Sequence, residues 1–113
     1  MNFSEISERA FELRQKYEAL EIKNCGRAWS KQEVFQGFVG DIGSLAKLIM
    51  AKEGLRNDVV DADEKLVHQL SDCLWCVLVL AKEYNIDLEK TFMESMDNLE
   101  QRINSNLVAK ENK

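Results

Sequence analysis

Apolar residues recur every three or four positions along most of the chain, which is the spacing of amphipathic α-helices. No segment alternates apolar and polar residues in the way that a half-buried strand does. We therefore predict an all-α fold, a four-helix bundle in one domain over residues 1–113, with a polar C-terminal tail from about residue 108. The expected helices run from Ser4 to Ile22, from Ser30 to Gly54, from Asp61 or Asp63 to Tyr84, and from Asp87 to Leu107.

Residues at the expected helix ends fit these boundaries. Ser30 and Glu33 have the spacing of a capping box, and Trp29 is placed to pack on Val34 as a hydrophobic staple. The other helix ends carry residues suited to a left-handed or side-chain cap, namely Gly54, Asn85 and Asp87.

The third expected helix contains the run CLWCVLVLA, from Cys73 to Ala81, which is apolar on every side. A helix that is apolar all round must be covered all round. Three partner helices in a chain of this length do not provide that cover. We therefore expect a homo-oligomer, a homodimer or a homotetramer, that forms through the third and fourth helices.

Charge and composition narrow the function. The chain has 15 basic and 20 acidic side chains and a formal charge of -5, without a basic run, which argues against a nucleic-acid partner. The N-terminus lacks the apolar core of a signal peptide, and no apolar run approaches the about 20 residues of a membrane span. Three cysteines without a disulfide framework suit a reducing compartment. We expect a cytoplasmic protein that binds no membrane.

Three glycines surround a carboxylate in the second expected helix, in the segment GFVGDIGSLAK. Gly37, Gly40 and Gly43 share a face, although each glycine costs about 1 kcal/mol relative to alanine in a helix interior. Such a face admits either another helix backbone or a ligand. Asp41 lies within roughly 60° of the apolar stripe of this helix, so we expect a half-buried carboxylate.

A second carboxylate, Asp72, lies in the third helix on a face that also carries Gln69 and Cys76. If the two helices pack together, two acids approach each other, and a buried charge must be paired or bound to a metal. Two simpler explanations are a basic partner for each acid, and contact with solvent at the edge of the bundle. The pair Cys73 and Cys76 lies within an apolar run, so we interpret both as small core residues rather than as zinc ligands or a redox pair.

The segments GDIGSLA, residues 40–46, and HQLSDCLW, residues 68–75, are similar to the paired helix motifs of the MazG-like, all-α nucleoside triphosphate pyrophosphohydrolases. In that family one helix carries E-E-x-x-E and the next carries E-x-x-D. The likeness continues through VLVLAKEYNIDLEKTF and covers the chain from about Trp29 to Arg102. The resemblance implies the all-α pyrophosphatase type of bundle.

The resemblance also implies a site for Mg²⁺, or Mn²⁺, because the acids of the family bind magnesium. Asp41 and Asp72 match acids of the two motifs, whereas Ser44 and Gln69 stand where the family has acids and offer only neutral oxygens. Contacts to a nucleotide are expected from three residues, although a solvated lysine and a packed tryptophan are the simpler interpretations: Lys47, Arg102 and Trp29.

The implied activity is hydrolysis of a nucleoside triphosphate, NTP or dNTP, to the monophosphate and pyrophosphate. The alternative is a catalytically disabled MazG-like oligomer that binds a nucleotide or a protein partner, because two of the four expected acids are replaced. The general base is left open among four acids: Asp41, Asp72, Glu53 and Asp58.

Overall fold

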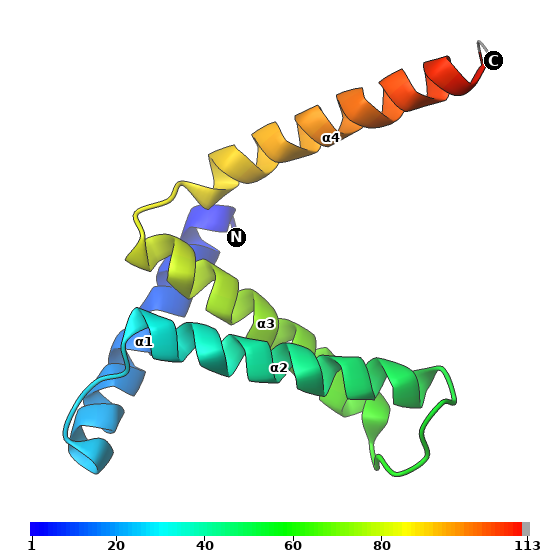
Figure 1. The fold of residues 1–113 in the computed structure, drawn as a ribbon. Coiled ribbons are helices and arrows are strands. Elements are labelled where there is room, and N and C mark those ends of the chain that lie inside the picture. Colours follow the sequence, from blue (N-terminus) through cyan, green and yellow to red (C-terminus); the bar gives the residue numbers. More distant parts are fainter. Residues whose placement is uncertain (112–113) are drawn as a thin grey trace.

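Four α-helices make up the fold (Figure 1). The computed structural model describes the backbone of residues 1–111 and the side chains of residues 1–109. No strand occurs in this part of the chain, so the predicted all-α class is confirmed. The helices are α1 (Phe3–Cys25), α2 (Lys31–Lys52), α3 (Ala62–Glu83) and α4 (Leu88–Glu111).

Two helices extend further than the sequence pattern predicts. The side chain of Asn2 accepts a hydrogen bond from the Glu5 amide at 2.9 Å and starts α1, which ends only where Gly26 takes a left-handed conformation with φ 83°. α4 continues beyond Leu107 to Glu111, through alanine, lysine and glutamate, which favour helix. The remaining tail residues, 112–113, lie outside the described residues.

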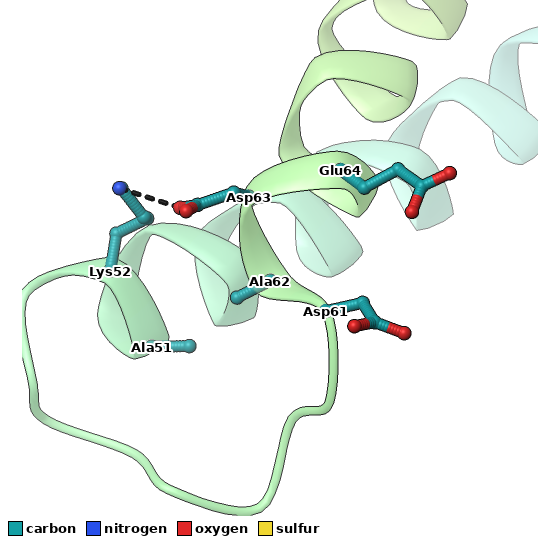
Figure 2. Close-up of a pocket in the computed structure, with 6 residues that line it drawn as sticks. All are labelled: Ala51, Lys52, Asp61, Ala62, Asp63 and Glu64. Atoms are coloured by element: carbon teal, nitrogen blue, oxygen red, sulfur yellow. Dashed lines mark ion pairs between the residues drawn. The ribbon is translucent and has the colours of Figure 1, made fainter.

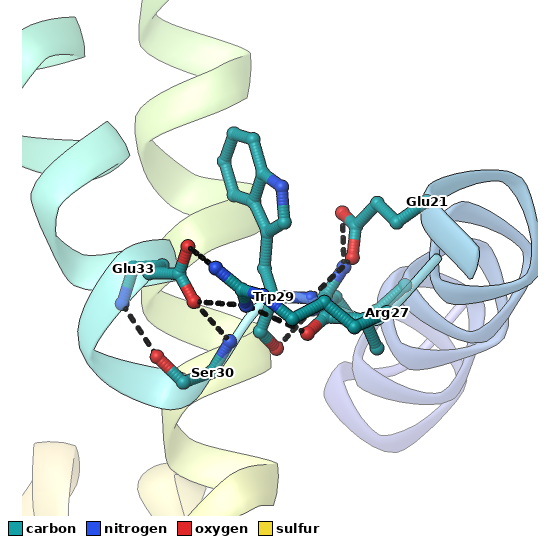
Figure 3. Close-up of polar contacts among 7 residues, drawn as sticks. Glu21, Arg27, Trp29, Ser30 and Glu33 are labelled. Carbon is teal, nitrogen blue, oxygen red and sulfur yellow. Dashed lines mark hydrogen bonds and ion pairs between the residues drawn. The ribbon is translucent and has the colours of Figure 1, made fainter. Parts of the chain in front are cut away.

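The predicted capping box at the start of α2 is confirmed (Figure 3). Ser30 Oγ accepts from the Glu33 amide at 3.2 Å, and Glu33 Oε1 accepts from the Ser30 amide at 3.1 Å. Arg27 donates two hydrogen bonds to the same carboxylate, at 2.7 and 3.0 Å. These bonds, with that of Arg27 first, lower the pKa of Glu33 to about 2, and the pKa of Arg27 is raised in turn.

The predicted caps at the other helix ends are confirmed as well. Gly54 follows α2 with φ 77°, and Asn85 follows α3 with φ 56°, both in the left-handed region. Asp87 Oδ1 accepts from the Lys90 amide at 3.2 Å and starts α4. These short-range bonds fix where each helix begins and ends.

α3 forms the centre of the packed part, with α2 along one side of it and α1 along another (Figure 1). The indole Nε1 of Trp75 donates to the Ala10 carbonyl of α1 at 3.0 Å, and its ring lies 6.0 Å from that of Tyr17. α2 and α3 run antiparallel as a hairpin. The buried apolar residues come from all three helices: Ala10, Val34, Leu48, Cys76, Leu78, Val79 and Ala81.

A buried arginine joins α1 to the loop before α2. Arg14 is 2% exposed and donates to Glu21 at 2.9 Å and to the Trp29 carbonyl at 3.1 Å. Glu21 also accepts a hydrogen bond from the Trp29 amide at 2.8 Å. Because the arginine and its carboxylate satisfy the loop backbone, they fix the point at which the chain turns from α1 into α2.

α4 leaves the other three helices and projects outward (Figure 1). Every described side chain of α4 after Leu88 is exposed. The radius of gyration is 18.6 Å, whereas a compact domain of this length has about 13 Å. Three helices therefore pack together within one chain, and the fourth has no cover of its own.

Replacing the buried arginine is expected to destabilise the fold strongly. Arg14→Met removes the donor to Glu21 Oε2 and to the Trp29 carbonyl, so we expect the free energy of unfolding to fall by about 3 kcal/mol. Arg9 is exposed and pairs with Glu12 alone among the described residues. Arg9→Met should therefore change the free energy of unfolding by at most about 0.5 kcal/mol. Urea unfolding followed by circular dichroism measures both, and equal effects would contradict a role for Arg14 in the loop.

The ion pair of Glu33 should make stability depend on acid pH. The pKa of Glu33 is about 2 in the folded chain against an ordinary 4.5, so its contribution is present above pH 4.5 and is lost as the pH falls towards 2. Glu33→Gln keeps a cap acceptor but loses the charge. We expect the melting temperature of Glu33→Gln to lie below that of the parent at pH 7 and to equal it near pH 2. Arg27→Gln should reproduce this pattern, and a difference that persists at pH 2 would exclude the ion pair as its cause.

Candidate functional site

Asp41 lies in the middle of the α2 face that packs on α3. It is half-buried, and its nearest polar neighbour is on the other helix. The thiol of Cys76, which is 4% exposed, donates to Asp41 Oδ2 with 3.8 Å between the sulfur and the oxygen. The contact forms because Asp41 shares its helix face with the buried Val34 and Leu48.

Asp72 and Gln69 lie one turn apart on α3, on the N-terminal side of Cys76. Asp72 is exposed and Gln69 is half-buried. The pKa of Cys76 rises to about 11, first because burial disfavours the thiolate and then because the negative charges of Asp41 and Asp72 lie near. Asp41 contacts the thiol directly, whereas Asp72 makes the smaller contribution to this pKa.

Gln69 carries a buried polar atom without a partner. Its Nε2 has no hydrogen bond in the described part of the chain. A buried donor that stays unpaired costs about 1–3 kcal/mol, so this amide calls for an acceptor. Rotation of the amide by half a turn exchanges the nitrogen for the oxygen, and the group can then face either an anion or a cation.

Ser44 borders the same junction from α2. It is exposed and follows Asp41 by almost one turn. Helical periodicity of 100° per residue places Ser44 and Asp72 on the same side of the hairpin. Of the four residues predicted as metal ligands, Asp41 and Gln69 are half-buried, and Ser44 and Asp72 are exposed.

The glycines beside Asp41 face open space. A Cβ atom built on Gly40 or Gly43 would meet nothing within 4 Å, and one on Gly37 would lie 3.8 Å from the Trp29 ring. Among the described residues, nothing lies within 4 Å of a Cβ built on Gly40 or Gly43, so close helix packing in this part of the chain does not explain these two glycines. This open face can admit a ligand or another molecule.

The ligand atoms at the junction determine whether it could bind a free magnesium ion or one that is already bound to phosphate. Among the described residues, no group of three or more His, Cys, Asp or Glu side chains is placed to hold a metal ion. Magnesium, however, is commonly bound through one or two carboxylates together with phosphate oxygens and water. The described residues therefore form no cage for a free ion, and binding of a phosphate-bound cation by Asp41 and Asp72 stays a prediction.

The residues predicted to contact a nucleotide do not converge within one chain. Trp29 and Lys47 lie near opposite ends of α2, about 27 Å apart along the helix axis. Arg102 lies on the projecting α4, in a shallow depression lined by Gln101, Ser105 and Asn106. Asp41 is about 9 Å along the helix from Lys47, so only Lys47 of these three lies near the carboxylates in sequence.

Two acids considered as general bases lie in the connection after α2. Asp58 accepts hydrogen bonds at 3.0 and 2.7 Å from Arg56, which lowers its pKa, and Lys47 contributes to a smaller degree. Glu53 is exposed at the end of α2. Because Asp58 is bound by Arg56, it is a poor acceptor for the proton of a water molecule.

A depression between the end of α2 and the start of α3 contains further acids (Figure 2). Lys52 forms an ion pair with Asp63 there, and this carboxylate raises the pKa of Lys52. Asp41 lies more than two helical turns back along α2. The acidic connection is therefore separate from the junction that holds Asp41 and Asp72.

The cysteine pair behaves mainly as part of the core. Cys76 is buried, Cys73 is half-buried, and neither forms a disulfide. The prediction of a core residue is confirmed for Cys76. Its hydrogen bond to Asp41 was not predicted, although helical periodicity places both residues on buried faces of neighbouring helices.

By length and composition alone, α2 could cross a membrane. Core helices of soluble proteins meet the same criteria. α2 packs on α3 along one face and carries Asp41 at its centre. The expectation of a protein without a membrane contact stays a prediction.

Comparison with known protein families, with curated proteins and with solved structures finds no match to this chain. Its class is therefore defined by its own fold and site. It is an all-α protein in which a helix hairpin brings two carboxylates, a thiol and an unpaired amide to one junction.

Proposed function

We propose that the chain is a magnesium-dependent nucleoside triphosphate pyrophosphohydrolase of the MazG-like type, which converts NTP or dNTP and water to the monophosphate and pyrophosphate. One observation carries the proposal: the half-buried Asp41 of α2 contacts Cys76 of α3, and Asp72 lies one helical turn from Cys76 on α3. Paired carboxylates on facing helices suit a cation that bridges to phosphates.

The residues of the junction divide into charged and neutral groups. Asp41 and Asp72 would hold the cation, with Ser44 as a weak neutral ligand. Bound magnesium, or manganese, would neutralise phosphate charge during the displacement. The unpaired Nε2 of Gln69 would donate to a phosphate oxygen, which is the acceptor that this buried amide lacks.

The hydrolysis also needs an acceptor for a proton. Water forms a bond to one phosphorus of the α–β anhydride, the anhydride oxygen leaves with pyrophosphate, and one proton of the water is released. Asp72 is the better candidate for the base, through the carboxylate oxygen that does not bind the cation, because Asp72 is exposed and has no hydrogen-bond partner among the described side chains. Asp41 already accepts a bond from Cys76.

Loss of either carboxylate should abolish turnover. With Mg²⁺ or Mn²⁺ and a panel of nucleoside triphosphates, we expect Asp41→Asn and Asp72→Asn to lower the rate of pyrophosphate release by at least roughly 100-fold. Asp61→Asn is the matched control, since this exposed aspartate makes no capping bond. If the parent releases pyrophosphate and each variant releases it at the same rate, the site lies elsewhere.

A second candidate function follows from the neutral residues. Ser44 and Gln69 supply no charge, and the described residues hold no group of three potential ligands. The chain would then be a disabled relative that binds a nucleotide without hydrolysing it. Ser44→Asp combined with Gln69→Glu distinguishes the two: turnover that appears only in this variant identifies a disabled site.

The proposed protein acts as a homo-oligomer, because one chain exposes far too much surface. A compact monomer of 13.0 kDa has about 6,300 Å² of accessible surface. The chain exposes 8790 Å², roughly 2,400 Å² more. An interface of this size per subunit is typical of obligate homo-oligomers.

The exposed apolar residues form continuous stripes that a second copy can cover. On α2 and α3 these stripes lie roughly 110° from the faces that pack together. Because the helices run antiparallel, both stripes fall on the same side of the hairpin, opposite Ser44 and Asp72. The residues are Phe35, Val39, Ile42 and Ile49 on α2, Val67, Leu70, Leu74 and Val77 on α3, and Phe92, Met96, Leu99 and Ile103 on α4.

Sedimentation equilibrium or light scattering should find a dimer or tetramer in the parent. Ile42→Glu and Leu74→Glu place charges on the hairpin stripe, so we expect each to lower the subunit number or to weaken association at least 100-fold, with Lys47→Glu as an exposed control. Circular dichroism reports whether the variants stay helical. A helical, monomeric parent, or one that associates only with phospholipid vesicles, would overturn this proposal.

A further inference from the structure

Cys76 is the one residue of the junction to which the proposed chemistry gives no role. Cys76 is 4% exposed and lies on α3, where its thiol contacts Asp41 of α2. Its thiol is the only hydrogen-bond partner of the Asp41 side chain within the described part of the chain, at 3.8 Å. No lysine or arginine there forms an ion pair with Asp41.

A half-buried carboxylate with one weak donor is restrained but not neutralised. A thiol is a weak donor without charge, so it can orient the carboxylate while its full negative charge stays available to a cation. The bond engages Oδ2 and leaves Oδ1 without a partner among the described residues. Outer partners of this kind commonly orient carboxylates that bind metals.

The position of the thiol is itself fixed by the core. Cys76 lies one turn before the fully buried Val79 on α3, and both face the helices packed against α3. The orientation of Asp41 is thereby tied to the rigid centre of the molecule rather than to its own helix alone.

We propose that Cys76 is a positioning residue, whose thiol holds the Asp41 carboxylate in the orientation that binds a phosphate-bound divalent cation. This inference rests on the proposed function. In this inference, α3 supplies Asp72 and also orients Asp41 of α2 through Cys76.

Substitutions at Cys76 separate positioning from packing. Cys76→Val fills the space without a donor, and Cys76→Ser keeps a donor. With Mn²⁺ and α,β-methylene-ATP, followed by calorimetry or by electron paramagnetic resonance of Mn²⁺, we expect Cys76→Val to weaken binding about 10-fold and Cys76→Ser to restore most of it. Cys73→Val is the matched control on the same helix, since Cys73 makes no such bond in the described part. Melting temperatures verify that each variant folds.

A spectroscopic readout tests the bond without metal or activity. In a background of Cys25→Ser and Cys73→Ser, the Raman S–H stretch belongs to Cys76 alone. We expect this band at a lower frequency than that of a free thiol, and expect Asp41→Asn, but not Asp72→Asn, to shift it. A band at the free-thiol position in the parent would overturn the inference.

The two proposals fail in different ways. If the parent binds the Mn²⁺ analogue complex and Cys76→Val binds it equally well, the positioning role is wrong and the proposed function stands. If the parent binds no Mn²⁺ with any nucleotide, the proposed function is wrong, and the role of Cys76 is overturned with it.

Discussion

The packing of α2 against α3 is the constraint from which the rest of the structure follows. Val34 and Leu48 bury one face of α2 on α3, and Asp41 lies midway between them on that same face. The carboxylate is therefore drawn to the interface by its apolar neighbours rather than by a partner of its own. Its position is stable because several kcal/mol of apolar burial fix the register of the two helices, while its single bond to Cys76 contributes little.

The hairpin presents two unlike sides, and under the proposed function this division would separate binding from assembly. One side carries small and polar residues, Gly40, Ser44 and Asp72, with open space at the glycine. The other side carries the exposed apolar stripes of both helices. A second copy on the apolar side would leave the carboxylates accessible. A second copy that also covered α4 would stabilise this helix, because an amphipathic helix gains most of its stability from tertiary packing.

The features that could be predicted from the sequence are those that depend on residues close together along the chain. The capping box of Ser30 and the caps at Asn85 and Asp87 depend on residues three or four positions apart, so the pattern determines them. The path of α4 could not be predicted, because α4 makes no extensive contact with the other helices in the described part of the chain that would fix its direction. The bond between Asp41 and Cys76 was missed because it requires the register between two helices, which periodicity alone leaves open.

In the proposed site, Ser44 and Gln69 stand where the MazG-like family has acids, and this difference would change more than the strength of cation binding. Four carboxylates attract a free divalent ion strongly, but they also repel the negative charge of a triphosphate when the cation is absent. Two carboxylates attract the ion less and repel the phosphates less, so they favour the preformed cation–nucleotide complex over either component. The buried amide of Gln69 adds a donor for a phosphate oxygen at the point where an acid would repel it. On this argument the substitutions shift binding from the metal towards the nucleotide, and a chain that had lost catalysis would still retain nucleotide affinity.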